Sequence, residues 1–132
     1  MYSPELLDHF QNPRNAGQLP PPARTVEVSN PACGDILRLS ARWEGDRLAE
    51  VRYLTRGCTA SIAAGSALTE LARGKTAPEL AELTPAEVES ALGGLSNESK
   101  HAAVLAIDAL RALLKEQRPA AVPAPASAAP RG

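Results

Sequence analysis

The sequence of 132 residues has little of what several functional classes require. Its formal net charge is −1, and acidic and basic residues are interspersed, so it carries no electrostatic footprint for nucleic acid or an anionic membrane. Aromatic residues make up only 3% of the chain, which disfavours nucleic-acid binding by base stacking. No apolar run approaches the roughly 20 residues of a membrane-spanning helix. We therefore expect one small domain with neither a nucleic-acid nor a membrane partner.

Cysteine is also scarce, since the chain contains only Cys33 and Cys58. The two thiols could form one disulfide, but nothing in the sequence marks a secreted protein. Residues 1–10 have no basic start followed by an apolar block, so they are not expected to be a secretory signal. We therefore predict free thiols and a cytoplasmic location.

Helices are predicted from clear start and stop signals. Ser3 is placed to cap a first helix, which the Asn12-Pro13 pair ends. Its apolar face is predicted to carry Leu6, Leu7 and Phe10. Two capping boxes, residues 76–79 and 84–87, predict two short helices. The longer predicted helices cover residues 59–73, which Gly74 ends, and residues 96–117, with Val104 among the apolar positions.

Alternating apolar residues predict three strands, at residues 24–29, 35–43 and 48–55, with a turn at 44–47. Strands followed by helices indicate an α+β fold, in which a small three-stranded antiparallel sheet packs against about five helices. We expect one domain over residues 1–117. Residues 118–132 are rich in Pro and Ala and are expected to form a disordered tail.

Four side chains with metal-binding chemistry lie at predicted element ends. Cys33 and Asp35 belong to "NPACGD", the turn before the second strand. Cys58 precedes a helix, whose N-terminus favours a thiolate, and His101 lies in the first turns of the last helix, which favours a neutral imidazole. Two thiolates, one imidazole and one carboxylate could form a four-coordinate site for a borderline-soft metal.

Each of these residues also has a purely structural interpretation. Cys58 could be packed in a small-residue helix, Asp35 could cap a turn, and His101 could be a helix-start residue without ligand function. His9 is expected at the surface or at a helix end. No oxyanion hole or orienting third group accompanies a Cys–His pair, which argues against nucleophilic catalysis.

Four collinear segments resemble the IscU/NifU-type iron–sulfur cluster scaffolds. They are "YSPELLDHFQNPRNAG" at residues 2–17, "NPACGD" at 30–35, "RGCTASIAAGSALTELARGKT" at 56–76 and "KHAAVLAIDAL" at 100–110. Their order and spacing agree over roughly residues 2–115, which makes the resemblance far more specific than any one motif.

The resemblance implies an IscU/SufE-like fold and a scaffold on which a transient [2Fe–2S] cluster is built. A cysteine desulfurase would deliver sulfur, and the cluster would pass to apo acceptor proteins. The positions that match the family's ligands are Cys33, Asp35, Cys58 and His101, and Zn²⁺ can occupy the same ligands in the family. The aspartate is implied to make the cluster labile.

The sequence departs from the family pattern at two positions. The family's third cysteine follows the histidine directly, but Ala102 stands there and can neither bind metal nor accept sulfur. Residues 95–99, "LSNES", lack the prolines of the chaperone-docking motif, so a dedicated Hsp70 chaperone is not expected. The insertion that marks the zinc-dependent SufU branch is also absent.

Two functions are therefore considered. The first is an iron–sulfur scaffold or carrier, not an enzyme, that binds iron and a transient [2Fe–2S] cluster. A [2Fe–2S] cluster usually has four thiolate ligands, so two thiolates with Asp35 and His101 should hold iron weakly. The alternative is a degenerate zinc-binding relative that docks on a cysteine desulfurase, as a regulator or sulfur-relay partner, without building clusters. A structural relic without metal is a third possibility, and the oligomeric state is left open.

Overall fold

A three-stranded antiparallel sheet, in the order β1-β2-β3, forms one layer of the structure. The computed structural model describes residues 2–30 and 34–116. The strands are β1 (Arg24–Ser29), β2 (Ile36–Glu44) and β3 (Arg47–Arg56). The turn between β2 and β3 contains Gly45, whose φ of 62° is one that glycine adopts without strain. The predicted sheet, with residues 24–29 as an edge strand, is confirmed.

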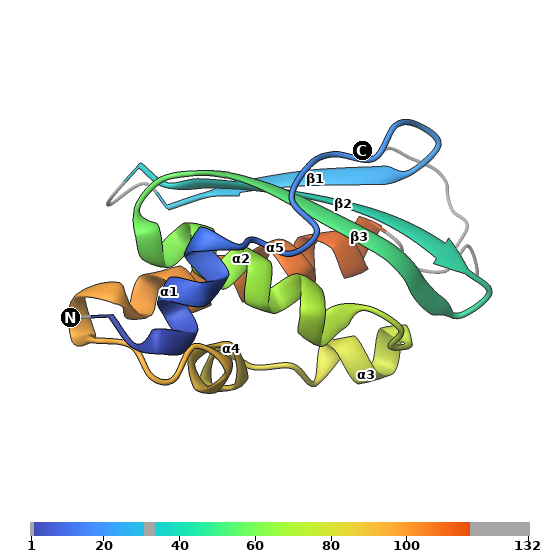
Figure 1. Cartoon of the computed structure of the whole chain (residues 1–132). Helices are drawn as coiled ribbons and strands as arrows, with labels where there is room; N and C mark the ends of the chain where they lie inside the picture. The colour runs from blue at the N-terminus through green and yellow to red at the C-terminus, as the bar shows by residue number, and fades with distance from the viewer. Residues whose placement is uncertain (1, 31–33, 117–132) are drawn as a thin grey trace.

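Helices form the second layer, on one side of the sheet (Figure 1). They are α1 (Pro4–Gln11), α2 (Thr59–Ala72), α3 (Ala77–Ala81), α4 (Pro85–Ala91), a 3₁₀ turn η1 (Asn97–Ser99) and α5 (Lys100–Glu116). α5 packs against β1 and β2, and α2 packs against β3 and α5. This arrangement confirms the predicted α+β class.

Local sequence signals explain where the first and the short helices begin. The Ser3 hydroxyl accepts a hydrogen bond from the Leu6 N–H at 3.0 Å, so it caps α1 as predicted. The Glu79 carboxylate accepts from the Thr76 N–H at 2.9 Å, which closes the first predicted capping box at α3. The second box opens α4 in the same way.

The core lies between the sheet and the central helix α2. Leu39 and Tyr53 project from the sheet and are at most 2% exposed. α2 offers mainly small side chains to this face, including Ala64, which is fully buried. A Cβ at Gly65 would lie 2.4 Å from the Tyr53 ring, so this helix approaches β3 as closely as only glycine allows.

The segment after α1 covers the free edge of β3. The Gly17 N–H donates to the Tyr53 carbonyl at 2.8 Å, and the Tyr53 N–H donates to the Asn15 carbonyl at 3.0 Å. These bonds form a short parallel bridge between Ala16 and Tyr53. The end of the first family-like segment, residues 12–17, therefore protects a sheet edge that would otherwise expose unpaired backbone groups.

The apolar residues of two predicted helices are not all buried. On α1, Leu6 is 1% exposed, but Leu7 and Phe10 are 38% and 37% exposed, because the helix turns its Leu6 side toward α2. On α5, Val104 is 47% exposed, so it lies outside the buried stripe of that helix. The apolar pattern predicted both helices but not which of their apolar residues meet a neighbour.

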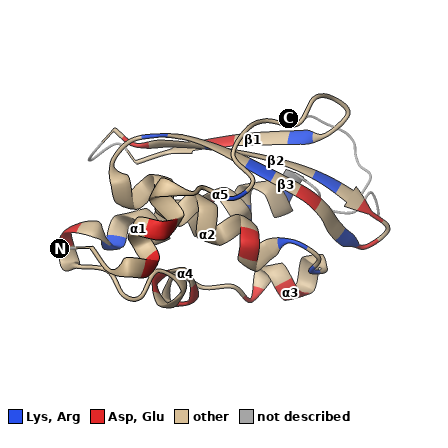
Figure 2. Ribbon diagram, in the orientation of Figure 1, with Lys and Arg blue, Asp and Glu red and all other residues tan. Residues whose placement is uncertain are grey.

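Acidic residues gather on helices α1–α4, whereas α5 and the strands carry both signs (Figure 2). Apart from His9, every ionisable residue of α1–α4 is acidic, whereas arginine outnumbers glutamate on the strands. Ion pairs on the exposed side of the sheet, such as Arg38 with Glu27 at 2.7 Å, neutralise part of this arginine excess. Although the net charge of the chain is near zero, helices α1–α4 are therefore acidic and the strands carry an excess of arginine.

Within residues 2–30 and 34–116, no helix is long and apolar enough to cross a membrane. The predicted tail, residues 118–132, lies outside the described residues.

Candidate metal centre

Three of the four predicted ligands meet at one end of the sheet. The Cys58 Sγ lies 3.5 Å from the Asp35 Oδ2 and 3.9 Å from the His101 Nε2. The same His101 nitrogen lies 3.4 Å from the Asp35 Oδ2. The structure thus brings together side chains from three segments that are distant in sequence, and each offers one ligand atom within 4.8 Å of the other two.

Two helix N-termini flank these side chains. Cys58 is the N-cap residue of α2, separated from β3 only by Gly57, and its side chain makes no capping hydrogen bond. His101 is the second residue of α5, directly after η1. The start of each helix therefore fixes where one of these two side chains enters the site.

A hydrogen bond from the His101 ring determines which of its nitrogens carries the proton and which faces Cys58 and Asp35. The Nδ1 lies 2.9 Å from the Glu98 carbonyl oxygen, and because a carbonyl can only accept, this nitrogen carries the proton. In the neutral ring the Nε2 then has a free lone pair, directed at Cys58 and Asp35. A backbone acceptor on the far nitrogen is the usual arrangement for a metal-binding histidine. The altered "LSNES" segment supplies this carbonyl.

Asp35 is almost fully buried, with a side chain 8% exposed. The Ser61 hydroxyl, on the first turn of α2, donates a hydrogen bond to its Oδ2 and lies 3.4 Å from the Cys58 Sγ. On the other side, a Cβ at Gly57 would lie 2.6 Å from the carboxyl carbon. Neither Ser61 nor Gly57 was predicted, although the i, i+3 spacing of Cys58 and Ser61 places them on one helix face.

The distances suit a single metal ion. Tetrahedral ligands bonded to zinc at their usual lengths stand about 3.3–3.8 Å apart. The observed separations of 3.4 and 3.5 Å lie in this range and the third, 3.9 Å, is slightly longer, so these donors fit three corners of such a site after a small adjustment. The fourth corner would need another ligand, and Cys33, the predicted one, lies outside the described residues.

The residues beside Cys33 form a closed turn. The Gly34 N–H donates to the Asn30 carbonyl at 2.7 Å, and the Asn30 N–H donates to the Asp35 carbonyl at 2.8 Å. Gly34 has a φ of 78°, which a residue with a side chain rarely adopts. These two bonds join the residue that follows β1 to the residues that precede β2.

The second histidine, His9, lies in the last turn of α1, so the predicted helix-end position is confirmed, but its side chain is buried and not at the surface. It is 8% exposed between α1 and α2, with Nδ1 2.8 Å from the Ser66 hydroxyl and Nε2 3.6 Å from the Glu70 carboxylate. Burial is the main cause that lowers the pKa of His9, and the Arg14 charge adds to it. His9 therefore links two helices and does not join the three converging donors.

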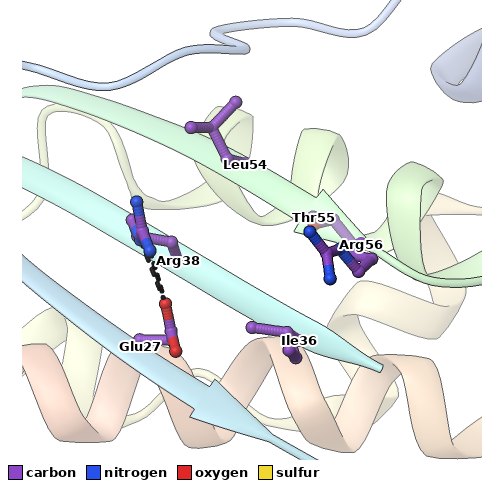
Figure 3. A pocket seen from close by; sticks show the side chains of 6 residues that line it. All are labelled: Glu27, Ile36, Arg38, Leu54, Thr55 and Arg56. Carbon is purple, nitrogen blue, oxygen red and sulfur yellow. Dashed lines mark hydrogen bonds and ion pairs between the residues drawn. The ribbon is translucent and has the colours of Figure 1, made fainter. Parts of the chain in front are cut away.

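A separate pocket of about 360 Å³ lies on the exposed side of the sheet (Figure 3). It is lined by Glu27, Ile36, Arg38, Leu54, Thr55 and Arg56. None of the converging donors lines it, but Ile36 directly follows Asp35, and Arg56 lies two residues before Cys58. The pocket is therefore adjacent to the candidate metal centre without being part of it.

The sequence also matches a described family. Residues 1–120 match the NifU-like N-terminal domain. The chain belongs to this family. The predicted resemblance is thereby confirmed over nearly the whole chain.

Curated relatives in this family carry names that state their function. The chain is 42% identical to the iron–sulfur cluster assembly scaffold protein IscU 1 of Archaeoglobus fulgidus, over 84% of this chain and 72% of that one. It is 36% identical to the IscU scaffold protein of Aquifex aeolicus, over 87% and 74%. It is 48% identical to the bifunctional protein NifU/MnmA of Rubrobacter xylanophilus, over 83% of this chain but only 23% of that longer protein.

Solved structures support the fold. A protein from Fervidobacterium islandicum, described as a scaffold for iron–sulfur cluster assembly in the SUF system, superposes with a TM-score of 0.68 at 22% identity, over 86% of this chain and 96% of that one. The N-terminal part of a NifU-like protein from Brucella abortus gives a TM-score of 0.68 at 17% identity, over 87% and 94%. The two-layer architecture is therefore the family's fold.

Proposed function

We propose that this protein is a scaffold or carrier for iron–sulfur cluster assembly, and not an enzyme. It binds iron and a transient [2Fe–2S] cluster through Cys33, Asp35, Cys58 and His101, and passes the cluster to apo acceptor proteins. The observation that carries the proposal is the convergence of the Cys58, Asp35 and His101 donors within 3.4–3.9 Å of one another. The names of the family members support it.

The ligand chemistry suits a temporary cargo. Thiolates are the preferred ligands of iron–sulfur clusters, whereas a carboxylate oxygen is a harder donor that binds them less well. Ala102 takes the place of the third cysteine, so the site offers two thiolates at most. A cluster held in this way should leave more readily than one held by four cysteines, which is what a carrier requires.

The partners follow from this function. A cysteine desulfurase supplies sulfur as persulfide, and apo iron–sulfur proteins receive the cluster. Ala102 cannot accept persulfide, so Cys33 and Cys58 are the only thiols available for this step. We place the protein in the cytoplasm, where reducing conditions keep thiols free.

Anaerobic reconstitution with a cysteine desulfurase, ferrous iron and cysteine tests the proposal. Visible absorption of a cluster should develop at stoichiometric iron in the wild type and be lost in Cys58→Ser and His101→Ala. The matched control is His9→Asn, which removes the other imidazole of the chain and should retain the absorption if circular dichroism shows a folded protein. Absence of absorption in the wild type would refute the proposal.

A second function is favoured by the spacing of the donors. Their separations match the corners of one tetrahedral ion, and the site has one cysteine fewer than the family pattern. The protein would then hold Zn²⁺ and dock on a cysteine desulfurase as a regulator or sulfur-relay partner. Stoichiometric zinc in isolated protein, together with a zinc-dependent change in desulfurase turnover, would support it. Purified protein without zinc and without affinity for the desulfurase would exclude it.

A further inference from the structure

Ser61 occupies a position that no ligand assignment explains. It is the third residue of α2, one turn after Cys58, and it is only 3% exposed. Its hydroxyl does not cap the helix; it donates to the Asp35 Oδ2 and lies 3.4 Å from the Cys58 Sγ. A buried hydroxyl thus contacts two of the three converging side chains.

We propose that Ser61 is a positioning residue of the metal centre. It holds the Asp35 carboxylate in the orientation that directs Oδ2 at the bound metal, and it thereby sets the affinity of the site and the lifetime of the bound ion. The inference rests on the proposed function in that it takes Asp35 and Cys58 to be ligands.

The geometry around the carboxylate explains why one hydroxyl has this effect. A carboxylate can rotate and present either oxygen. Here the Oδ1 side is closed by Gly57, where an added Cβ would lie 2.6 Å from that oxygen. On the other side, the Ser61 hydroxyl donates to Oδ2, the same oxygen that lies 3.5 Å from the Cys58 Sγ and 3.4 Å from the His101 Nε2. Asp35 is therefore fixed as a ligand through a single oxygen.

Water cannot easily take over this role. Asp35 and Ser61 are 6% and 3% exposed, so bulk water does not readily replace a hydrogen bond lost between them. Removing the hydroxyl should let the carboxylate rotate away from Cys58 and His101. Loss of a hydrogen bond that orients a ligand typically lowers metal affinity about 10- to 100-fold.

The test is the zinc affinity of Ser61→Ala, which adds no bulk, measured by competition with a chromogenic chelator. We expect affinity about 10- to 100-fold below wild type and correspondingly faster release to excess chelator. Ser61→Thr retains a hydroxyl and should restore affinity relative to Ser61→Val, which has the same shape without it. The control is Ser66→Ala, which removes another buried hydroxyl of α2 and should leave zinc affinity unchanged.

A double-mutant cycle separates positioning from general structural damage. In an Asp35→Ala background, Ser61→Ala should have little further effect on zinc affinity, because the side chain that it orients is gone. Equal zinc affinity of Ser61→Ala and wild type, or the same loss with and without Asp35, would overturn the inference. Zinc alone is used, so failure of cluster reconstitution would leave this result standing.

Discussion

Gly57→Ala is the most informative single change at the metal centre. Gly57 has no positive φ, so an alanine backbone is acceptable there, and the three described atoms nearest to an added Cβ all belong to the Asp35 side chain. The new Cβ would lie 2.6 Å from the Asp35 Cγ and Oδ1, whereas ordinary contact begins at 3.4 Å. The overlap of about 0.8 Å exceeds what small adjustments absorb.

The magnitude follows from this overlap. Overpacking of a buried position typically costs about 1–3 kcal/mol of unfolding free energy. Asp35 can relieve the clash only by leaving its place beside Ser61 and Cys58, so zinc affinity should fall about 10- to 100-fold at the same time. Urea unfolding gives the first quantity, and chelator competition gives the second.

An Asp35→Ala background tests the cause directly. The Cγ and Oδ1 are then absent and the closest remaining Asp35 atom is the Cβ, at 3.0 Å, so the stability cost of Gly57→Ala should drop below about 1 kcal/mol. The reasoning is refuted if Gly57→Ala leaves stability and zinc affinity unchanged, or if its cost is the same in both backgrounds.

Three further predictions concern other parts of the molecule. Gly65→Ala should destabilise the protein by about 1–2 kcal/mol in urea unfolding, because overlap with the Tyr53 ring outweighs the gain in helix propensity; increased stability would contradict the packing described. Burial lowers the pKa of His9 from 6.5, so as the pH falls the imidazole takes up a proton in the unfolded chain before it does so in the folded protein. The unfolding free energy should therefore decrease below about pH 6.5 and be constant above it. His9→Gln should flatten this profile, and an unchanged profile would assign the effect to another group. Ala102→Cys should increase cluster yield and lifetime in anaerobic reconstitution, and unchanged absorption in a folded variant would show that residue 102 does not reach the site.

The fold could be predicted largely because its signals are local. Ser3 and the capping boxes define helix starts within a few neighbouring residues, and alternation defines the strands. Burial on α1 could not be predicted in this way, since the helix buries Leu6 and His9 against α2 and exposes Leu7. That choice depends on the shape and hydroxyl groups of the neighbouring helix.

Some residues of the candidate site could likewise be predicted from the sequence, and others could not. Asp35, Cys58 and His101 have ligand chemistry that can be recognised in the sequence, and their predicted positions at element ends explain why they converge. Ser61 and Gly57 have no such chemistry. Their importance comes from contacts across the fold, a hydrogen bond to Asp35 and a Cβ position that only glycine leaves empty. Contacts of this kind, between residues that are distant in sequence, can be recognised only in the folded structure.

The metal and sulfide content of protein isolated without oxygen tests the central claim most directly. The account predicts iron and acid-labile sulfide in equal amounts in the wild type, below one cluster per chain because the site holds its cargo weakly, with both lost in Cys58→Ser and His101→Ala and both retained in His9→Asn. Wild-type protein without iron and sulfide, or variants with the same content as the wild type, would contradict it.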